Sequence, residues 1–228
     1  MKRLNILWIG LISILMTACY DDYEKDYDKS SVYFASQKPL RTLVADTDMS
    51  IKVGVAIGGK REVHTDDWAT FEIDPSLLDG TGLTLMPENY YQLANPNKMT
   101  ISNPNLAIAD VKVTFSDAFY EDDDALNKHY AIPFRLIDHN QDEISTDVNG
   151  NLKDYSIVVV KFVSQYHGTY FVKGKVTNLS TQQVTEYSNK DLSQNMTRDF
   201  VSLGRNKVRR PGFGNTLENN ESVNLTVN

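Results

Sequence analysis

The residues that could carry out catalysis do not occur at the sequence spacings of the common catalytic motifs. The chain has no HExxH motif for zinc, no GxSxG turn for a nucleophilic serine and no phosphate-binding glycine loop. The histidines are scattered, at His64, His129, His139 and His167. Cleavage of a glycosidic bond would need two carboxylates facing each other across a cleft. The chain has enough acidic residues to supply two such carboxylates, but their spacing in the sequence does not show that any two face each other. These residues are Glu62, Asp66, Asp67, Glu72 and Glu88. We therefore expect no catalytic residues and no cofactor.

Two acidic segments resemble calcium loops only in part. Calcium loops place their carboxylates at alternating positions, with a glycine in the turn and a distal glutamate. Residues 121–124 are four contiguous acids, which favours a solvated turn. Asp138, Asn140 and Asp142 do alternate, but the glycine and the distal glutamate are missing. We therefore expect no metal site in either segment.

Aromatic side chains are better candidates, because they suit recognition of a sugar. A sugar ring presents C–H groups that lie flat on an aromatic ring, and rings provide large contact areas at low entropic cost. Trp68 follows a loop-like stretch, although packing in a core is its more common role. Tyr90 and Tyr91 would point to opposite faces of a strand, leaving one exposed. Tyr120 and Tyr166 complete the set of candidate ligand-binding residues.

The first 18 residues have the organisation of an export signal. Two positive charges follow Met1, an apolar run extends from Leu4 to Met16, and small residues precede Cys19. The run is too short to span a bilayer, which takes about 20 apolar residues. Residues 15–19, Leu-Met-Thr-Ala-Cys, resemble the lipobox of bacterial lipoproteins. That resemblance implies cleavage before Cys19, the chain's single cysteine, and a membrane anchor through lipid on its thiol. An ordinary signal peptide with an incidental cysteine is the alternative.

Residues 19–29 form an acidic tether. The nine residues from Tyr20 to Asp28 contain five carboxylates and one lysine, a composition that is typical of a solvated segment. An acidic stretch directly after the lipidated cysteine also resembles the surface-export signal of Bacteroidetes-type lipoproteins. The expected location is therefore the outer membrane, lipid-anchored and facing the cell exterior rather than the periplasm.

The net charge argues against a nucleic-acid partner. The chain carries −7, and loss of Lys2 and Arg3 with the signal would change this to −9. A negative protein has no general attraction for nucleic acid or anionic lipid. Residues 205–210 are the local exception, with four basic side chains before Pro211-Gly212. We expect them to form a solvated loop.

Short runs of alternating apolar and polar residues, separated by turn formers, predict strands through most of the chain. Residues 49–57, 106–115 and 155–163 are clear examples, and one or two helical turns are expected within 116–126, as a crossover rather than a core helix. The pattern predicts an all-β fold: an immunoglobulin-like antiparallel β-sandwich over residues 30–164. A small or incomplete second β domain is expected over 165–228, where apolar residues are few.

The strand sequences also resemble a known family. Residues 32–35 (VYFA), 71–78 (FEIDPSLL), 90–93 (YYQL), 98–101 (KMTI) and 130–137 (YAIPFRLI) are similar to the immunoglobulin-like N-terminal domain, of unknown function, of Bacteroidetes-type surface lipoproteins from polysaccharide-utilisation loci. Residues 166–170 (YHGTY) resemble the start of the β-rich domain that often follows this N-terminal domain. In the family, that second domain is usually longer than the stretch from residue 165 to residue 228.

The resemblance implies a non-catalytic role in capturing polysaccharide at the cell surface, or in assisting a partner outer-membrane transporter. Two other hypotheses remain open at this point. The chain could be a structural spacer or assembly partner without affinity for sugar, or a fragment of a glycan hydrolase. The sequence identifies neither the glycan, nor the protein partners, nor the oligomeric state.

Overall fold

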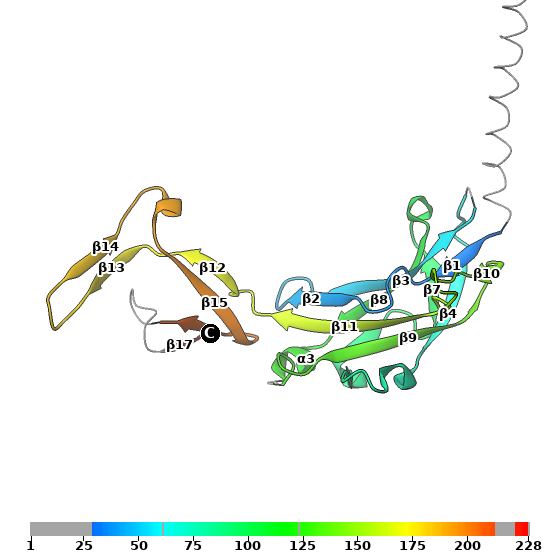
Figure 1. The fold of residues 1–228 in the computed structure, drawn as a ribbon, viewed down its shortest axis with the longest axis horizontal. Coiled ribbons are helices and arrows are strands. Elements are labelled where there is room, and N and C mark those ends of the chain that lie inside the picture. The colour runs from blue at the N-terminus through cyan, green and yellow to red at the C-terminus, as the bar shows by residue number, and fades with distance from the viewer. Residues whose placement is uncertain (1–28, 61, 123, 213–221, 228) are drawn as a thin grey trace, which may run out of the picture.

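The computed structural model describes residues 29–60, 62–122, 124–212 and 222–227 (Figure 1). The signal segment, Cys19 and nearly all of the acidic tether therefore lie outside the described residues. The strands are β1 (Ser31–Tyr33), β2 (Leu40–Val44), β3 (Ser50–Gly58), β4 (Trp68–Ile73), β5 (Thr84–Leu85), β6 (Tyr91–Leu93), β7 (Lys98–Ile101), β8 (Ile108–Phe115), β9 (Tyr130–His139), β10 (Glu143–Ile144), β11 (Tyr155–Val163), β12 (Gly168–Phe171), β13 (Gly174–Thr177), β14 (Val184–Tyr187), β15 (Thr197–Gly204), β16 (Lys207–Pro211) and β17 (Ser222–Thr226). The helices are α3 (Asp117–Glu121) and the short 3₁₀ turns η2 (Pro75–Leu78), η3 (Glu88–Tyr90), η4 (Pro104–Leu106) and η5 (Leu192–Gln194).

The first eleven strands form one curled sheet in the order β10-β1-β3-β8-β7-β4-β9-β11-β2, with β5 beside β9 and β6 beside β8. The predicted all-β class is confirmed. The sheet is mixed rather than wholly antiparallel, because β1 pairs with β10, β2 with β11 and β5 with β9 in parallel. Strands β2 and β11 are far apart in sequence, so no hairpin constrains their relative direction.

The core lies inside the curled sheet. Strands β3 and β8 alternate as predicted, and the inward-facing side chains Val53, Val55 and Val113 are at most 5 % exposed. They belong to the same cluster as Phe134 and Val160 from β9 and β11. The two halves of the sheet therefore face each other and share one apolar interior, as in a sandwich.

Helix α3 lies where the sequence predicts a helical turn, between β8 and β9. It connects these two strands as the predicted crossover, but it also contributes to the core, which we did not expect, because Phe119 and Tyr120 are both buried. The Phe119 ring packs 5.5 Å from Phe115 and 5.4 Å from Phe162, centroid to centroid. The short helix therefore closes one end of the core with aromatic side chains.

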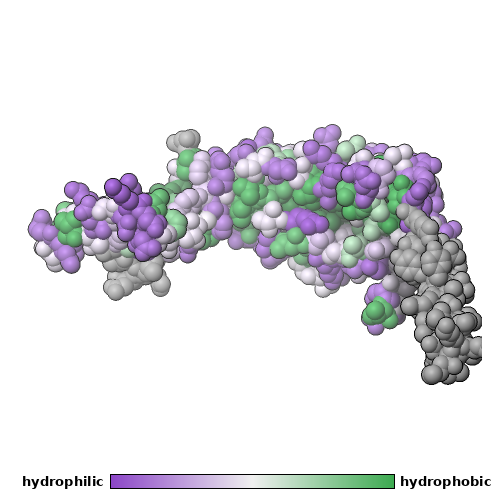
Figure 2. Space-filling view, turned by 90° about the horizontal axis from the view of Figure 1, so that it is seen from above, coloured by the Kyte–Doolittle hydropathy of each residue, from purple (hydrophilic) through white to green (hydrophobic). Residues whose placement is uncertain are grey.

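The chain leaves the curled sheet after β11 and forms two smaller sheets. Strands β12-β15-β16-β17 make a four-stranded sheet, and β13-β14 make a hairpin. Figure 2 shows the resulting elongated outline, with hydrophobic and hydrophilic side chains interspersed on the visible face. Among the described residues beyond Ser164, only Arg198, Val208 and Gly212 are buried. This part of the chain has little core of its own.

The basic segment 205–210 is not the loop that we expected. Lys207–Pro211 is strand β16, paired on one side with β15 and on the other with β17. Lys207 and Arg209 face outward, whereas Val208 between them is 1 % exposed. This alternation of exposed and buried residues is typical of a strand. It was not recognised in the sequence because the outward-facing positions of the segment are highly charged.

Candidate ligand-binding cavity

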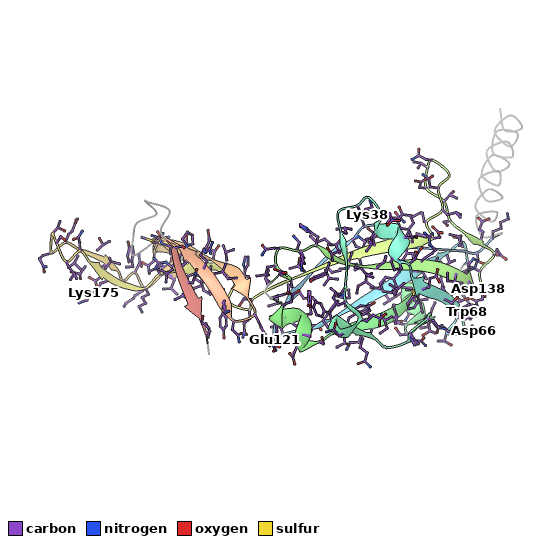
Figure 3. The ribbon with its side chains drawn as sticks, turned by 90° about the horizontal axis from the view of Figure 1, so that it is seen from below. Lys38, Asp66, Trp68, Glu121, Asp138 and Lys175 are labelled. Carbon is purple, nitrogen blue, oxygen red and sulfur yellow. The ribbon has the colours of Figure 1, made fainter. Side chains whose placement is uncertain are left out.

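The five aromatic residues that the sequence suggests do not form one site. Figure 3 shows Trp68, with Asp66 and Asp138, towards one end of the curled sheet and Glu121 of α3 towards the other. Tyr120 and Tyr166 line a common cavity near Glu121. Trp68 is therefore separated from the cavity that Tyr120 and Tyr166 share.

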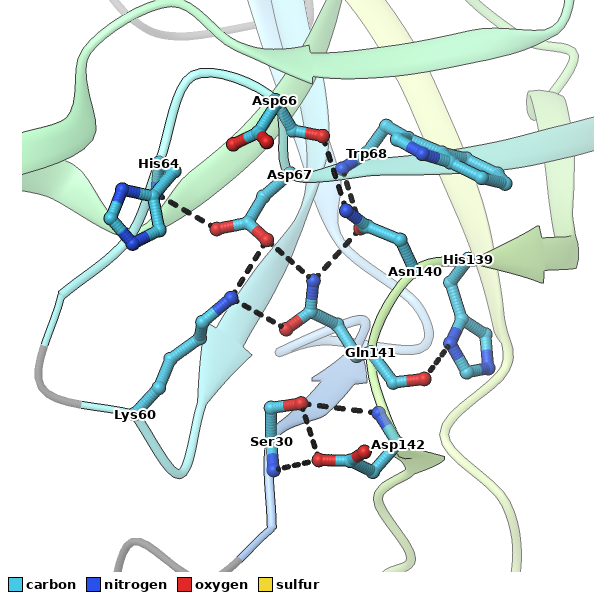
Figure 4. Close-up of polar contacts among 10 residues, drawn as sticks. All are labelled: Ser30, Lys60, His64, Asp66, Asp67, Trp68, His139, Asn140, Gln141 and Asp142. Atoms are coloured by element: carbon cyan, nitrogen blue, oxygen red, sulfur yellow. Dashed lines mark hydrogen bonds and ion pairs between the residues drawn. The ribbon is translucent and has the colours of Figure 1, made fainter.

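Trp68 is only partly exposed, and its position is fixed by neighbours. Its backbone N–H donates to Asn140 Oδ1 at 2.9 Å, and Asn140 Nδ2 donates to the carbonyl of Asp66 at 3.1 Å (Figure 4). The Lys98 ammonium lies 4.9 Å from the centroid of the indole ring. Because a cation already covers this ring, Trp68 is a poorer platform for a sugar than its sequence context suggests.

Asp67 anchors the loop that precedes Trp68. The residue is 3 % exposed, and its carboxylate accepts from Lys60 Nζ at 2.7 Å, from the His64 N–H at 2.8 Å and from Gln141 Nε2 at 2.9 Å (Figure 4). Burial by itself opposes ionisation, but the hydrogen bonds from Lys60, His64 and Gln141 outweigh it and hold the pKa of Asp67 below its ordinary value. This network joins distant segments of the chain, which indicates a structural role.

Tyr90 and Tyr91 both pack against the core, so the alternation that we expected for them does not apply. Tyr90 ends the 3₁₀ turn η3 and is not in a strand, and its ring lies 5.6 Å from that of Tyr130 in an edge-on arrangement. Tyr91 begins β6, pairs with Phe115 and is only partly exposed. Burial raises the pKa of both phenols. Both side chains are therefore partly taken up by packing against the core, and neither belongs to the lining of the cavity described below.

The junction cavity lies between the curled sheet and the four-stranded sheet and has a volume of about 650 Å³. One wall comes from the β2–β3 loop and the end of α3, and the other from the segment before β12, the β15–β16 turn and the end of β17. Its lining residues are Asp46, Tyr120, Glu121, Asp122, Gln165, Tyr166, Gly204, Arg205, Asn206, Lys207, Thr226 and Val227. This volume lies within the range of ligand sites, about 300–1,000 Å³.

Arg205 connects the two walls of the junction cavity. From the β15–β16 turn, its Nε and Nη2 donate to Asp46 Oδ1 at 2.9 and 2.6 Å, and its Nη1 lies 2.8 Å from Asp117 Oδ1 and 3.8 Å from Glu121 Oε1. Its guanidinium carbon is 5.9 Å from the centroid of the Tyr120 ring. These acidic partners raise the pKa of Arg205. A charge with this many partners fixes the cavity walls and leaves little of Arg205 free for a ligand.

Tyr120 contributes an unused hydroxyl. Its side chain is 1 % exposed, and its Oη has no hydrogen-bond partner among the described residues. Burial raises the pKa of this phenol well above its ordinary value, so the hydroxyl keeps its proton and can donate. A buried polar atom without a partner carries a desolvation cost that a ligand hydroxyl would relieve. The orphaned hydroxyl therefore makes Tyr120 a candidate contact for a polar ligand.

The remaining lining residues provide contacts of the kinds that sugars need. Tyr166 is half-buried, and its phenol oxygen accepts a weak 3.3 Å hydrogen bond from Gln165 Nε2. Gln165 and Asn206 are exposed amides that can both donate and accept, and Lys207 can donate. The sequence suggests Tyr120 and Tyr166 individually. It does not suggest Arg205, Gln165 or Asn206, because these polar residues have no distinctive spacing and come together only in the fold.

Asp122 also lines the junction cavity, and the pKa of its carboxyl group is lowered. Desolvation opposes its ionisation, but a 2.7 Å hydrogen bond from the Tyr130 hydroxyl and one from the Asp124 N–H outweigh this and lower the pKa of Asp122. A general acid for cleavage of a glycosidic bond needs a raised pKa instead. Asp122 is therefore suited to remain ionised and to accept hydrogen bonds.

Over the described part of the chain, no three His, Cys, Asp or Glu side chains lie close enough together to hold a metal ion. None of the helices there has the length and apolar character needed to cross a membrane.

Comparison with solved structures gives the fold. The chain matches a protein of unknown function from Bacteroides ovatus with a TM-score of 0.70 and 20 % identity, over 88 % of this chain and 73 % of the other. An auxiliary nutrient binding protein from Bacteroides thetaiotaomicron matches at a TM-score of 0.45 and 10 % identity, over 83 % and 66 % of the two chains. EndoBT-3987 from the same species, solved with a Man5GlcNAc product, matches at 0.40 and 21 %, over 60 % and 32 %. At these values only the first similarity supports an argument, and it concerns the fold alone.

The family is shown by sequence. No curated protein matches the chain. A family model described as "-like, N-terminal domain" matches residues 27–143, which is 117 of the 228 residues and therefore more than half of the chain. The matched segment includes strands β1 to β9 of the curled sheet. The chain therefore belongs to this N-terminal-domain family.

Proposed function

We propose that the chain is a lipid-anchored protein of the cell envelope that binds glycan in the junction cavity without cleaving it. The observation that carries the proposal is the buried Tyr120 hydroxyl, which has no partner among the described residues and belongs to a residue that lines the junction cavity. Around it lie Tyr166, amide side chains and carboxylates. An aromatic ring beside several groups that donate and accept hydrogen bonds suits the mixed apolar and hydroxyl-rich surface of a sugar.

The non-catalytic part of the proposal rests on the acids in the cavity. The pKa of Asp122 is lowered, whereas a general acid needs a raised pKa. Asp46 and Glu121 are held by Arg205, with Asp46 Oδ1 only 2.6 Å from Nη2. Carboxylates that are engaged in this way can orient hydroxyl groups, whereas hydrolysis needs one protonated acid and one free base or nucleophile. Accordingly, glycan should be retained without release of new reducing ends.

Affinity electrophoresis of the full chain on a panel of soluble polysaccharides tests the proposal, with released reducing ends assayed in parallel. We expect retardation without product on at least one polysaccharide. Tyr166→Ala should weaken binding about tenfold because it removes the ring. Tyr120→Phe should weaken binding about two- to tenfold, because it removes only the hydroxyl that the ligand would satisfy.

Trp68→Ala is the matched control, because Trp68 lies outside the junction cavity. Its binding should stay within about twofold of the parent chain. Loss of binding in Trp68→Ala but not in Tyr166→Ala would move the site to the other end of the curled sheet. Absence of retardation with every polysaccharide would reject glycan binding and favour a spacer role. Product release would reject the non-catalytic assignment.

The anchor part of the proposal rests on the sequence around Cys19. We expect the chain to take up labelled palmitate in cells, and Cys19→Ser to abolish the labelling because the residue that receives the lipid is gone. Tyr20→Ser, a change next to the cysteine, is the control and should label normally. Continued labelling of Cys19→Ser would overturn the anchor. Digestion of the chain by a protease added to intact cells would support exposure on the outer surface, and protection would place it in the periplasm.

A further inference from the structure

A second cavity lies in the part of the chain beyond β11, and its walls are mostly apolar and aromatic, with two arginines among them. It has a volume of about 280 Å³ and is formed by the four-stranded sheet and the β13–β14 hairpin. The Tyr170 and Phe200 rings, from paired strands β12 and β15, lie 5.1 Å apart. We call it the Arg198 cavity, and its lining residues are Tyr170, Phe171, Val172, Val176, Tyr187, Arg198, Phe200, Arg210, Val223 and Leu225.

A guanidinium is buried in these apolar walls. Arg198 lies on β15 opposite Tyr170 and is 9 % exposed. Its Nη1 donates to the carbonyl of Thr197 at 3.0 Å. Its Nε and Nη2 are buried and have no hydrogen-bond partner among the residues that the structure describes. No acidic side chain belongs to the lining described above. Burying a charge without a counter-charge is costly, so this arrangement needs a reason.

The two unused donors are the pair that recognises a carboxylate. Nε and Nη2 lie on the same edge of the planar guanidinium, and their N–H bonds point in parallel towards the two oxygens of one carboxylate. The Nη1 bond to Thr197 uses the other side of the group. The rings of Tyr170 and Phe200 beside it provide faces for C–H groups. Arg198 therefore supplies two donors, unpaired among the described residues, with the geometry that a carboxylate needs, and it lines a cavity whose wall includes aromatic rings.

We propose that the Arg198 cavity binds a carboxylate-bearing sugar, a uronic acid residue, with its carboxylate on Nε and Nη2 of Arg198 and its ring against the aromatic wall. A neutral sugar with the same ring but no carboxylate would leave Nε and Nη2 of Arg198 without a charged acceptor. This cavity shares no lining residue with the junction cavity. The two proposals can therefore fail independently.

Calorimetric titration of the full chain with trigalacturonate and with the neutral galactose trimer tests the proposal. We expect trigalacturonate to bind at least about tenfold more tightly than the neutral trimer, because a hydrogen-bonded charge pair distinguishes them. Arg198→Met keeps the side-chain length and removes the charge. It should reduce binding of trigalacturonate about tenfold or more, to the level of the neutral trimer.

Two controls make the result decisive. Arg209→Met removes an outward-facing charge from the neighbouring strand β16 and should change the affinity by no more than about twofold. Arg198→Met should also raise the melting temperature of the ligand-free chain by about 2 °C or more, because an uncompensated buried charge is removed. A lowered melting temperature would show that Arg198 is paired within the protein. That result would overturn the proposal, as would unchanged binding by Arg198→Met, equal binding of the two trimers, or no binding of trigalacturonate.

Discussion

Asp67→Ala is expected to lower the free energy of unfolding by about 3 kcal/mol, because it leaves buried donors without an acceptor. In the folded chain the Asp67 carboxylate accepts from Lys60, the His64 N–H and Gln141. Lys60 keeps some contact with water, whereas Gln141 is 7 % exposed and cannot easily find another partner. For a chain of this length, the melting temperature should fall by about 6–12 °C.

Asp66→Ala is the matched control for Asp67→Ala. Asp66 is the preceding residue, its side chain is exposed, and its contact with Asn140 uses the backbone carbonyl, which alanine keeps. Its effect should stay within about 0.5 kcal/mol. Thermal and urea unfolding, followed by circular dichroism, would measure both variants. Equal stabilities of the two variants would show that the network does not hold the fold together.

The Asp67 network should also make stability depend on pH in a defined direction. The pKa of Asp67 is lower in the folded chain than in the unfolded chain, so its contribution is complete above the unfolded value, about 3.9. It is lost as the pH falls through the lower, folded value. The stability difference between the parent chain and Asp67→Ala should therefore be constant near neutrality and shrink only in acid. A difference that grew on acidification would contradict the assignment.

The sequence pattern predicted those strands whose burial alternates clearly from one residue to the next. Strands β3 and β8 alternate clearly because one face of each lies in the core. Strand β2 was missed because four of its five residues are exposed and its pairing partner, β11, is far away in the sequence. Strand β16 was missed because charged outer positions concealed one buried valine. Both depend on tertiary pairing, which a sequence window does not contain.

The candidate sites show the same limit. Residue type was enough to suggest Tyr120 and Tyr166, but not to show that one is buried and the other half-buried in a common cavity. Arg205 and Arg198 lie on the same strand or its turn, yet one is surrounded by acids and the other has two donors without partners among the described residues. No pattern in the sequence distinguishes them. Their difference comes from what the rest of the chain places around each guanidinium.

Gly54→Ala is expected to destabilise the chain by about 3 kcal/mol, although alanine is ordinarily at least as good as glycine in a strand. Gly54 lies in the middle of β3, opposite Asp110 of β8. A Cβ atom at this position would lie 2.5 Å from the carbonyl oxygen of Ala109 and 2.9 Å from Asp110 Cβ. The nearer of these atoms is backbone in a paired strand, so it cannot move without disturbing the centre of the sheet.

Gly58→Ala, on the same strand, separates this steric effect from the general effect of removing a glycine. The nearest atoms to a Cβ at Gly58 are Ser31 Oγ at 3.4 Å and Tyr33 Cε1 at 3.7 Å, which are ordinary contacts. Gly58→Ala should therefore be neutral or stabilising by up to about 1 kcal/mol, because alanine restricts the unfolded chain. Urea unfolding of both variants measures the contrast. If Gly54→Ala were as stable as Gly58→Ala, the close approach of β3 to β8 would not be what requires glycine at position 54. If only Gly54→Ala is destabilised, the requirement lies in the spacing of these two strands, on which the core between the two halves of the sheet depends.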